Sequence, residues 1–310
     1  MDKNDATTKE YYSNKNISNF YKTVWGGECI HVGMYDLNEN TSISEHKIES
    51  FDSTESIKHL IKTTIRNKCD IMYKLIRMYN YNNNYNIADF GSGFGGTARF
   101  IVESFNNNST NTRNNNIVHY YHIDCYDISK DNCHVNTTKT LKSNVYNNIT
   151  IYNRSFTDTL AKNNYYDFVI SEDAFIHIDD KNDIFKEINR VLNKNGLLIF
   201  SDIIRTENAN KKDIEEVCNR IGVSGIISDK EYLDLANKHE LKICNQIEYK
   251  EDMIKHYKNI KIIAEKTLDK DNNNEDYIKD YNKIINGLDN WIKHIELGNI
   301  TIKIYIFTKI

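Results

Sequence analysis

The sequence predicts an α/β protein built on a doubly wound, mostly parallel sheet of seven strands. From Ile87 onward, short apolar runs rich in β-branched and aromatic residues alternate with longer amphipathic runs, the pattern of a parallel sheet covered by helices. A glycine-rich run, Gly91-Ser92-Gly93-Phe94-Gly95-Gly96, directly follows the first apolar run. The chain has 310 residues, enough to bury one large core and to carry added helical segments.

Seven segments have the length and composition of strands: 86–90, 118–126, 149–154, 168–171, 197–202, 241–249 and 301–307. Between the fourth and fifth of these, Ile184, Phe185, Ile188, Val191 and Leu192 fall on one helical face. We expect this helix to end at Asn195-Gly196, because both residues tolerate a left-handed backbone.

Two segments lie outside the alternation of strands and helices. Residues 1–85 predict an N-terminal helical cap, with its clearest helix at 56–79. Residues 251–298 predict a pair of helices broken near 272–274 and inserted before the last strand, as a lid over a substrate. The expected organisation is therefore a cap (1–85), a Rossmann-like ligand-binding core (86–250), a lid (251–298) and a final core strand (299–310).

Composition favours a small-molecule partner. The formal net charge of -4 provides no basic field for a phosphate backbone, so we expect no nucleic-acid partner. The polar N-terminus and the absence of a long apolar run predict no signal peptide, no stable membrane insertion and a cytoplasmic location. A helical cap can pack against a second copy, so a homodimer is compatible with the sequence.

The six cysteines predict neither a metal site nor a disulfide framework. They are scattered along the chain without a C-x-x-C pair, which leaves free thiols as the expected state. The metal-ligand prediction from the sequence is therefore none.

The glycine-rich run predicts a turn that cradles a nucleotide. Its glycines let the backbone turn tightly and approach a ligand, while the helix that begins near Thr97 presents its positive N-terminus. Gly91, Gly93 and Gly96 also satisfy G-x-G-x-x-G, the fingerprint of NAD-binding sheets. However, Asp89 stands two residues before the first glycine, where an acid suits a cationic ligand.

Polar and aromatic residues follow the next three predicted strands, at the sheet edge where ligands bind in this class of fold. Asp127 could accept both hydroxyls of a ribose, and Phe156 with Asp158 could hold an adenine ring and its amino group. Glu172-Asp173-Ala174-Phe175-Ile176-His177 would lie between cofactor and substrate. A single acid at a strand end is more often a helix cap, but this ordered set points to an adenosine site.

The ordered set resembles class I methyltransferases that use S-adenosylmethionine, over residues 87–202. In that resemblance Asp89 supports the methionine part of the cofactor, Asp127 is the ribose acid, and the segment 156–158 is the adenine-binding motif. The cofactor-binding residues that it implies are Trp25, Asp89, Gly91, Ser92, Gly93, Asp127, Ile128, Phe156, Thr157, Asp158 and Asp173.

A closer resemblance, over nearly the full length, is to sarcosine and dimethylglycine N-methyltransferases that form glycine betaine. It is carried by the segment that runs from Tyr11-Tyr12 through Asn19-Phe20-Tyr21 to Trp25-Gly26-Gly27-Glu28-Cys29-Ile30-His31-Val32-Gly33, by the block 172–177, and by Leu288-Asp289-Asn290-Trp291-Ile292 followed by Gly298. The chain departs from these relatives at 202–205, where they tend to place a proline, and in the Asn-rich segment 106–116. The resemblance implies N-methylation of a small amine.

On the substrate side, the expected catalytic residues are His177, Tyr21 and Arg205. His177 could take the departing proton, and Arg205, or else Arg154, could bind a substrate carboxylate. An aromatic cage for the cationic nitrogen is conceivable from Tyr11, Tyr12, Phe20, Tyr21 and Trp25, although the same residues could simply pack the cap.

Three other functions remain compatible with the sequence. The first is a methyltransferase of the same fold acting on phosphoethanolamine, a natural-product amine, or a lipid or quinone carbon. The second is a protein that binds the cofactor without catalysis, and the third is an NAD-dependent oxidoreductase. Methylation of exocyclic base amines is disfavoured because the chain has no proline and so lacks the Asn/Asp-Pro-Pro-aromatic motif.

Overall fold

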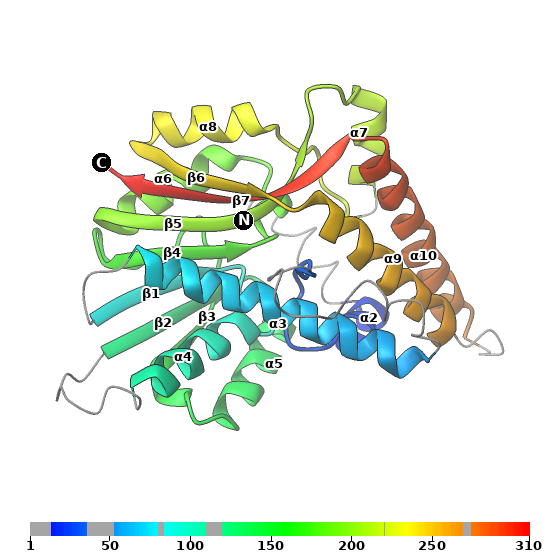
Figure 1. Cartoon of the computed structure of the whole chain (residues 1–310), viewed down its shortest axis with the longest axis horizontal. Helices are drawn as coiled ribbons and strands as arrows, with labels where there is room; N and C mark the ends of the chain where they lie inside the picture. The colour runs from blue at the N-terminus through cyan, green and yellow to red at the C-terminus, as the bar shows by residue number, and fades with distance from the viewer. Residues whose placement is uncertain (1–13, 36–52, 80–83, 110–119, 220, 269–273) are drawn as a thin grey trace.

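The computed structural model describes residues 14–35, 53–79, 84–109, 120–219, 221–268 and 274–310. They form a seven-stranded sheet in the order β3-β2-β1-β4-β5-β7-β6, with helices packed around it (Figure 1). The strands are β1 (Asn84–Phe90), β2 (Tyr120–Asp127), β3 (Ile149–Asn153), β4 (Tyr166–Glu172), β5 (Leu192–Arg205), β6 (Leu241–Glu248) and β7 (Ile300–Lys309).

The predicted doubly wound, mostly parallel sheet is confirmed. The strands β1 to β5 pair in parallel, while β7 runs antiparallel to both β5 and β6. Each of the seven predicted strand segments overlaps one of these strands, with ends that differ by up to five residues at β5. In the second segment, residues 118 and 119 lie outside the described part of the chain. The strand order reverses between β1 and β4, which makes their carboxyl ends the expected place for a ligand.

The junction between α6 (Lys181–Val191) and β5 corrects one sequence prediction. Leu192 was assigned to the helix, but its backbone is extended and it starts β5, where it pairs with Tyr166. Asn195 does adopt a left-handed conformation, with φ 62°, yet it lies inside β5 and does not end a helix. The pairing of β4 with β5 shifts register beside this point. The apolar Leu192 side chain is buried in either geometry, so helical periodicity alone did not locate the boundary.

Hydrophobic cores cover both faces of the sheet. On β4, Phe168 and Ile170 belong to one core and Val169 to the other, because successive side chains of a strand point to opposite faces. One face is covered by α6 and α8 (Asp229–Lys238), whose apolar residues join the second core. The other helices are α2 (Lys15–Thr23), α3 (Thr54–Met78), α4 (Gly96–Ser109), α5 (Lys130–Leu141), α7 (Lys211–Cys218), α9 (Lys250–Thr267) and α10 (Glu275–Glu296).

Helices α2, α9 and α10 gather at one end of the sheet, and α3 crosses in front of it (Figure 1). The predicted helix at 56–79 is α3, and the predicted pair at 251–298 is α9 and α10, between β6 and β7. Residues from these distant segments meet: Asn16 Nδ2 donates to Asp280 Oδ2 at 2.8 Å, and Gly33 N donates to His256 Nδ1 at 3.3 Å. The N-terminal segment and the insertion therefore pack together as one helical layer.

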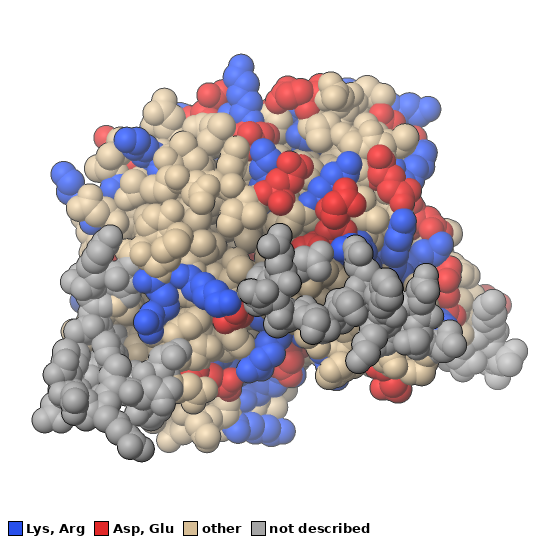
Figure 2. All heavy atoms as spheres, viewed as in Figure 1, with Lys and Arg blue, Asp and Glu red and all other residues tan. Residues whose placement is uncertain are grey.

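The surface shows no dominant charge on the face drawn in Figure 2, where acidic and basic side chains of the described residues are interspersed. Across the described part of the chain, no helix combines the length and the apolar character that a bilayer crossing requires.

Candidate active site

A cleft opens at the carboxyl ends of β1, β2 and β4, and its empty volume, mouth included, is about 610 Å³. This is the position that a doubly wound sheet gives to its ligands. The described residues that line it are Ile30, Gly91, Gly93, Asp127, Ile128, Asn132, Ser155, Phe156, Glu172, Asp173, Ala174, His177 and Ile178.

The glycine turn between β1 and α4 forms one wall of the cleft. Gly91 and Gly93 both have positive φ angles, 76° and 53°, which side chains other than glycine rarely adopt. A Cβ atom on Gly91 would also lie 2.3 Å from the Cβ of Ala174 on the opposite wall. Glycine is therefore required here both by the backbone angle and by the close approach of the two loops.

Asp127, at the end of β2, is held with its carboxylate at the cleft. Its oxygens accept hydrogen bonds from the backbone N–H of Gly93 at 2.9 Å and of Ser129 at 2.8 Å. Asn132 Nδ2 lies 3.4 Å from both oxygens. Burial outweighs these hydrogen bonds and raises the pKa of Asp127 to about 6. The carboxylate is thus fixed in place and titrates near the physiological range.

Asp89, the penultimate residue of β1, is not among the residues that line the cleft, but it has acceptor capacity that the fold does not use. Asp89 Oδ2 and Ser92 Oγ are buried and make no hydrogen bond within the described residues. Burial, and then the nearby carboxylate of Glu172, raise the pKa of Asp89 well above its ordinary value. A buried polar atom without a partner is costly, and a cationic or hydroxyl-bearing ligand would offset that cost.

Phe156 supplies an aromatic wall on the β3 side. Its ring stacks on Phe90 with centroids 5.5 Å apart and an interplanar angle of 13°. Ser155 joins it in the cleft, whereas Thr157 and Asp158 are not among the lining residues. Asp158 lies on the surface instead, where its Oδ2 is 3.6 Å from Arg154 Nη1.

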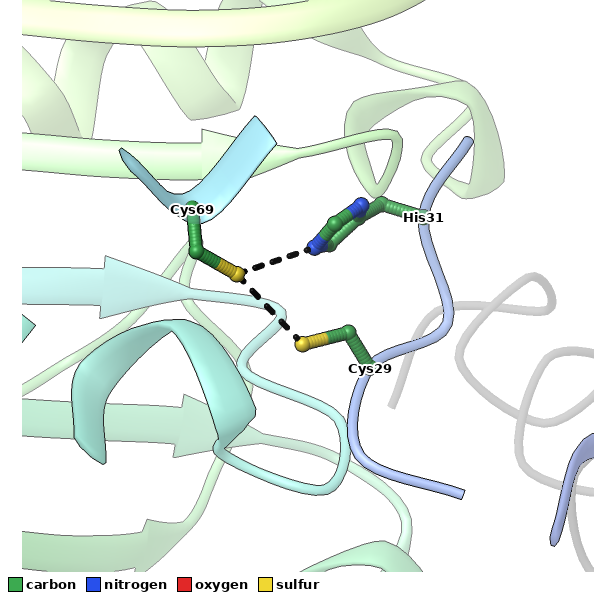
Figure 3. A group of neighbouring side chains, drawn as sticks. All are labelled: Cys29, His31 and Cys69. Carbon is green, nitrogen blue, oxygen red and sulfur yellow. Dashed lines mark hydrogen bonds between the residues drawn. The ribbon is translucent and has the colours of Figure 1, made fainter. Parts of the chain in front are cut away.

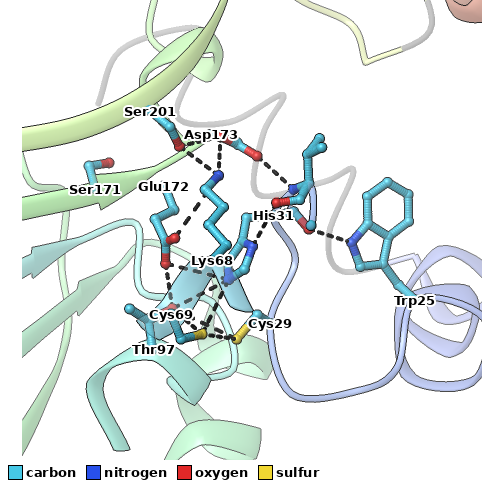
Figure 4. A network of polar contacts seen from close by, with 12 residues as sticks. Trp25, Cys29, His31, Lys68, Cys69, Thr97, Ser171, Glu172, Asp173 and Ser201 are labelled. Atoms are coloured by element: carbon cyan, nitrogen blue, oxygen red, sulfur yellow. Dashed lines mark hydrogen bonds and ion pairs between the residues drawn. The ribbon is translucent and has the colours of Figure 1, made fainter. Parts of the chain in front are cut away.

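Glu172, the last residue of β4, and Asp173, which follows it, belong to a buried polar network (Figure 4). Lys68 Nζ donates to Asp173 Oδ1 at 3.0 Å and to Ser201 Oγ at 2.8 Å. Burial alone would raise the pKa of Asp173, but the charges of Lys68 and His31 outweigh it and lower the pKa. Asp173 has a φ of 56°, a left-handed backbone that these contacts hold in place.

The N-terminal segment is tied to this network through Asp173. The backbone N–H of Val32 donates to Asp173 Oδ2 at 2.7 Å. His31 Nε2 lies 3.5 Å from Glu172 Oε2. Burial disfavours the charged imidazole, yet Glu172 and Cys29 outweigh this effect and raise the pKa of His31 to about 9. Segments that are about 140 residues apart in the chain thus form one wall of the cleft.

The expected substrate-side residues divide into two groups. His177 lines the cleft, on the short helix η3 (Phe175–His177). Tyr21 and Trp25 are buried in the core and do not line it; Trp25 Nε1 donates to the carbonyl of His31 at 3.0 Å. Arg205 Nη2 is ion-paired with Glu231 Oε2 at 2.7 Å, also away from the lining. Tyr11 and Tyr12 lie outside the described residues.

Several lining residues were not among the expected site residues. Asn132 could have been noticed, because it stands one turn into the helix that follows Asp127 and reaches back to it. Ile30 comes from a segment without regular structure, and no local pattern in the sequence indicates its place. The others are Ser155 and Ile178, both neighbours of expected residues, whereas Glu172 and Ala174 belong to the block 172–177 that was expected between cofactor and substrate.

These residues fit S-adenosylmethionine. Asp127 can accept ribose hydroxyls, the Phe156 ring can face adenine, and the unused Asp89 oxygen suits the ammonium group of the methionine part. Residues 88–200 match a family model described as a methyltransferase domain. With this domain, this fold and this cleft, the chain is an S-adenosylmethionine-dependent methyltransferase.

The similarity to particular enzymes extends beyond that domain. The chain is 24% identical over 263 residues to the sarcosine/dimethylglycine N-methyltransferase of Aphanothece halophytica, which covers 84% of this chain and 82% of that protein. It is 21% identical over 309 residues to the enzyme of the same name from Halorhodospira halochloris, with 98% and 96% covered.

A solved structure agrees with this similarity. It is a protein of Galdieria sulphuraria provisionally assigned as a sarcosine dimethylglycine methyltransferase. It superposes with a TM-score of 0.76 at 25% identity, over 94% of this chain and 97% of that one. The match therefore includes the helical layer as well as the sheet.

Proposed function

We propose that this enzyme methylates the nitrogen of a small amino acid, sarcosine or dimethylglycine, towards glycine betaine. One observation carries the proposal. The two sequence blocks that most resemble sarcosine and dimethylglycine N-methyltransferases, 25–33 and 172–177, meet at the cleft through the hydrogen bond from Val32 N to Asp173 Oδ2. The curated relatives, whose names specify these substrates, match along most of the chain and not in the methyltransferase domain alone.

When bound, S-adenosylmethionine supplies a methyl group on a sulfonium, already activated for displacement by a neutral amine nitrogen. In our proposal Asp127 and Asp89 hold the cofactor, and Phe156 faces its adenine. The protein then contributes mainly orientation and exclusion of water, effects worth up to about 7 to 11 kcal/mol in well-oriented reactions.

His177 is the proposed catalytic residue that faces the substrate. It lines the cleft beside Asp173 and Ala174, so its imidazole can orient the amine or accept the proton that the nitrogen must lose. We expect His177→Ala to lower kcat by about 10²-fold or more while leaving affinity for S-adenosylhomocysteine nearly unchanged. Steady-state kinetics and calorimetry on the same preparation would check this, and an unaltered kcat would remove His177 from the mechanism.

The cation that would bind a substrate carboxylate does not come from the described lining of the cleft, which contains neither lysine nor arginine. Arg205 is engaged with Glu231, so we do not assign it to the carboxylate. The buried aromatic rings of Tyr21 and Trp25 pack the helical layer, and in our proposal they support the cleft wall without contacting the amine.

Radiolabelled methyl transfer from S-adenosylmethionine tests the proposal. The acceptors to compare are glycine, sarcosine, dimethylglycine and phosphoethanolamine, with the Asp127→Ala variant as the control for cofactor binding. We expect label in betaine or dimethylglycine from the methylated glycines and none with Asp127→Ala. Labelling of phosphoethanolamine alone would assign the enzyme another amine, and no transfer despite cofactor binding would leave a binding protein.

A further inference from the structure

We propose that Cys29, His31 and Cys69 form a binding site for a divalent metal ion of the zinc class, completed by the hydroxyl of Thr97. The three side chains converge from the N-terminal segment and from helix α3 (Figure 3). Their potential ligand atoms all lie within 4.8 Å of one another, and all three residues are buried. Thiolate sulfur and imidazole nitrogen are the ligands that zinc prefers in proteins.

The spacing of the ligand atoms matches a tetrahedral ion. With zinc–sulfur bonds of about 2.3 Å and zinc–nitrogen bonds of about 2.0 to 2.1 Å, tetrahedral angles place two sulfurs about 3.8 Å apart and a sulfur and a nitrogen about 3.6 Å apart. The two sulfurs, Cys29 Sγ and Cys69 Sγ, are 3.8 Å apart, and Cys69 Sγ lies 3.7 Å from His31 Nε2. An ion therefore fits with little movement of the side chains.

Thr97, in the first turn of α4, occupies the fourth corner. Its Oγ1 lies 3.7 Å from Cys29 Sγ, 3.5 Å from Cys69 Sγ and 3.4 Å from His31 Nε2. The hydroxyl donates its proton to Glu172 Oε2, so the oxygen lone pairs remain for the ion. Glu172 thus accepts a hydrogen bond from the ligand Thr97 and orients it, as carboxylates commonly do around metal sites.

The orientation of His31 also suits a metal ligand. His31 Nδ1 lies 3.1 Å from the carbonyl oxygen of Val32. A carbonyl can only accept, so Nδ1 carries a proton. Nε2 lies beside the two sulfurs, and a bound ion would displace the proton that Nε2 holds in the charged ring and take its lone pair. A hydrogen bond from the distal ring nitrogen to a backbone carbonyl is the usual support of a metal-binding histidine.

An ion can reach these ligands without entering the cofactor cleft. A second cavity, about 810 Å³ including its mouth, is lined by both Cys29 and Cys69 and also by Gly96 and Arg99. The exposed fraction of each of the four ligand residues is 5% or less, so the bound ion would be shielded from water. With four protein ligands and no open position, such a site is structural and not catalytic.

The bound ion would hold one wall of the cofactor cleft in place, although the ion itself would lie outside the cleft. It would join the N-terminal segment to α3 and to the start of α4, three parts of the chain that no disulfide links. Ile30, between two of the ligands, lines the cleft. We therefore expect loss of the ion to weaken S-adenosylhomocysteine binding without abolishing it.

Metal analysis of the intact protein tests the proposal. The protein is purified under reducing conditions, stripped with a chelator and titrated with Zn²⁺ or Co²⁺. We expect one tightly bound ion per chain by elemental analysis, and with Co²⁺ the intense thiolate-to-cobalt absorption and the strong visible bands of a tetrahedral centre. Cys29→Ser and Cys69→Ser should each weaken binding by at least about tenfold to a hundredfold.

Cys218→Ser and Cys244→Ser are the matched controls, since one of these thiols is buried and the other exposed, and both lie outside the cluster. They should bind the ion as the wild type does. Circular dichroism would establish that each variant is folded; should a serine variant fail to fold, protection of two wild-type thiols from alkylation by Zn²⁺ is the alternative measurement.

Three results would overturn the proposal. The first is less than a tenth of an equivalent of metal bound by the reduced, folded wild type. The second is unchanged binding in a Cys29→Ser/Cys69→Ser double variant, which would place the ion elsewhere. The third is a Cys29–Cys69 disulfide, found by mass spectrometry in the purified protein, together with no metal binding after that disulfide has been reduced.

Discussion

At the scale of single residues, Asp127 shows how one carboxylate serves both the fold and the ligand. It receives two backbone N–H groups and so joins the glycine turn to the start of α5, yet it still faces the cleft. Because its pKa is raised to about 6 by burial, its charge is not guaranteed at mildly acidic pH. The protonation of Asp127 should therefore be measurable as a pH dependence of cofactor binding.

Cofactor affinity should depend on pH through Asp127. Ribose hydroxyls donate to the carboxylate, so binding favours the charged form and competes with protonation. Affinity for S-adenosylhomocysteine should therefore be constant above pH 6 and fall by about tenfold per pH unit below it. Calorimetric titrations across this range would measure the profile. In Asp127→Asn the affinity should be lower and this dependence absent; an identical profile in that variant would assign the titration to another group.

Lys68 should be among the most important residues for stability. Its side chain is fully buried and pairs with Asp173, with Glu172 nearby. Lys68→Met takes the fully buried ammonium away from two buried carboxylates and leaves only His31 beside them, which should lower the free energy of unfolding by about 3 to 5 kcal/mol. The control is Lys74→Met on the same helix, whose pair with Asp70 is exposed and should contribute under about 1 kcal/mol. Urea unfolding curves would compare them.

Two of the expected residues that line the cleft are Asp127, the last residue of β2, and Phe156, shortly after β3. Their place could be predicted because parallel strands bring their carboxyl ends to one edge; Asp89, inside β1, does not line the cleft, and its role in binding the cofactor stays a prediction. Arg205 also follows a strand, but it is the last residue of a long β5 and turns to α8. The group of Cys29, His31 and Cys69 depends on the packing of α3 against the N-terminal segment, which no spacing in the sequence encodes.

At the scale of elements, the sheet was more predictable than the junctions. The inner strands β4 and β5 appear as apolar runs because they are buried on both faces, whereas the edge strand β6 is mostly exposed. The passage from α6 into β5 was misplaced because Leu192 satisfies both periodicities. The close packing of α2 on α10 was also beyond the sequence, since amphipathic helices reveal which face is buried but not the partner that buries it.

Helix α10 should depend on Trp291 for its attachment. The indole is 1% exposed, packs on Tyr257 and donates to the carbonyl of Val217 at 2.9 Å. Trp291→Ala should lower the free energy of unfolding by about 3 to 5 kcal/mol through the cavity it leaves. Leu297→Ala, at an exposed residue just beyond the same helix, should change it by less than about 0.5 kcal/mol. Equal effects of the two substitutions would refute the anchoring role.

At the scale of the whole molecule, cofactor binding should raise thermal stability. A ligand at 100 times its Kd stabilises the folded state by about 2.7 kcal/mol, which corresponds to roughly 5 °C in Tm for a chain of this size. S-adenosylhomocysteine should produce this shift in a thermal melt. In the Asp89→Ala variant the shift in Tm should be smaller at the same ligand concentration, because the affinity of the variant for S-adenosylhomocysteine is expected to be at least about tenfold lower. A full shift in the variant would remove Asp89 from the cofactor site.

The position of β7 has a consequence for how the protein is made. This strand is the last of the seven along the chain, yet it lies between β5 and β6 and pairs with both. During synthesis β6 therefore has no neighbour in the sheet until β7 has left the ribosome. Pairings of such long range form slowly and leave strand edges exposed meanwhile. A nascent chain stalled before Ile300 should hold an open sheet edge and require protection from aggregation.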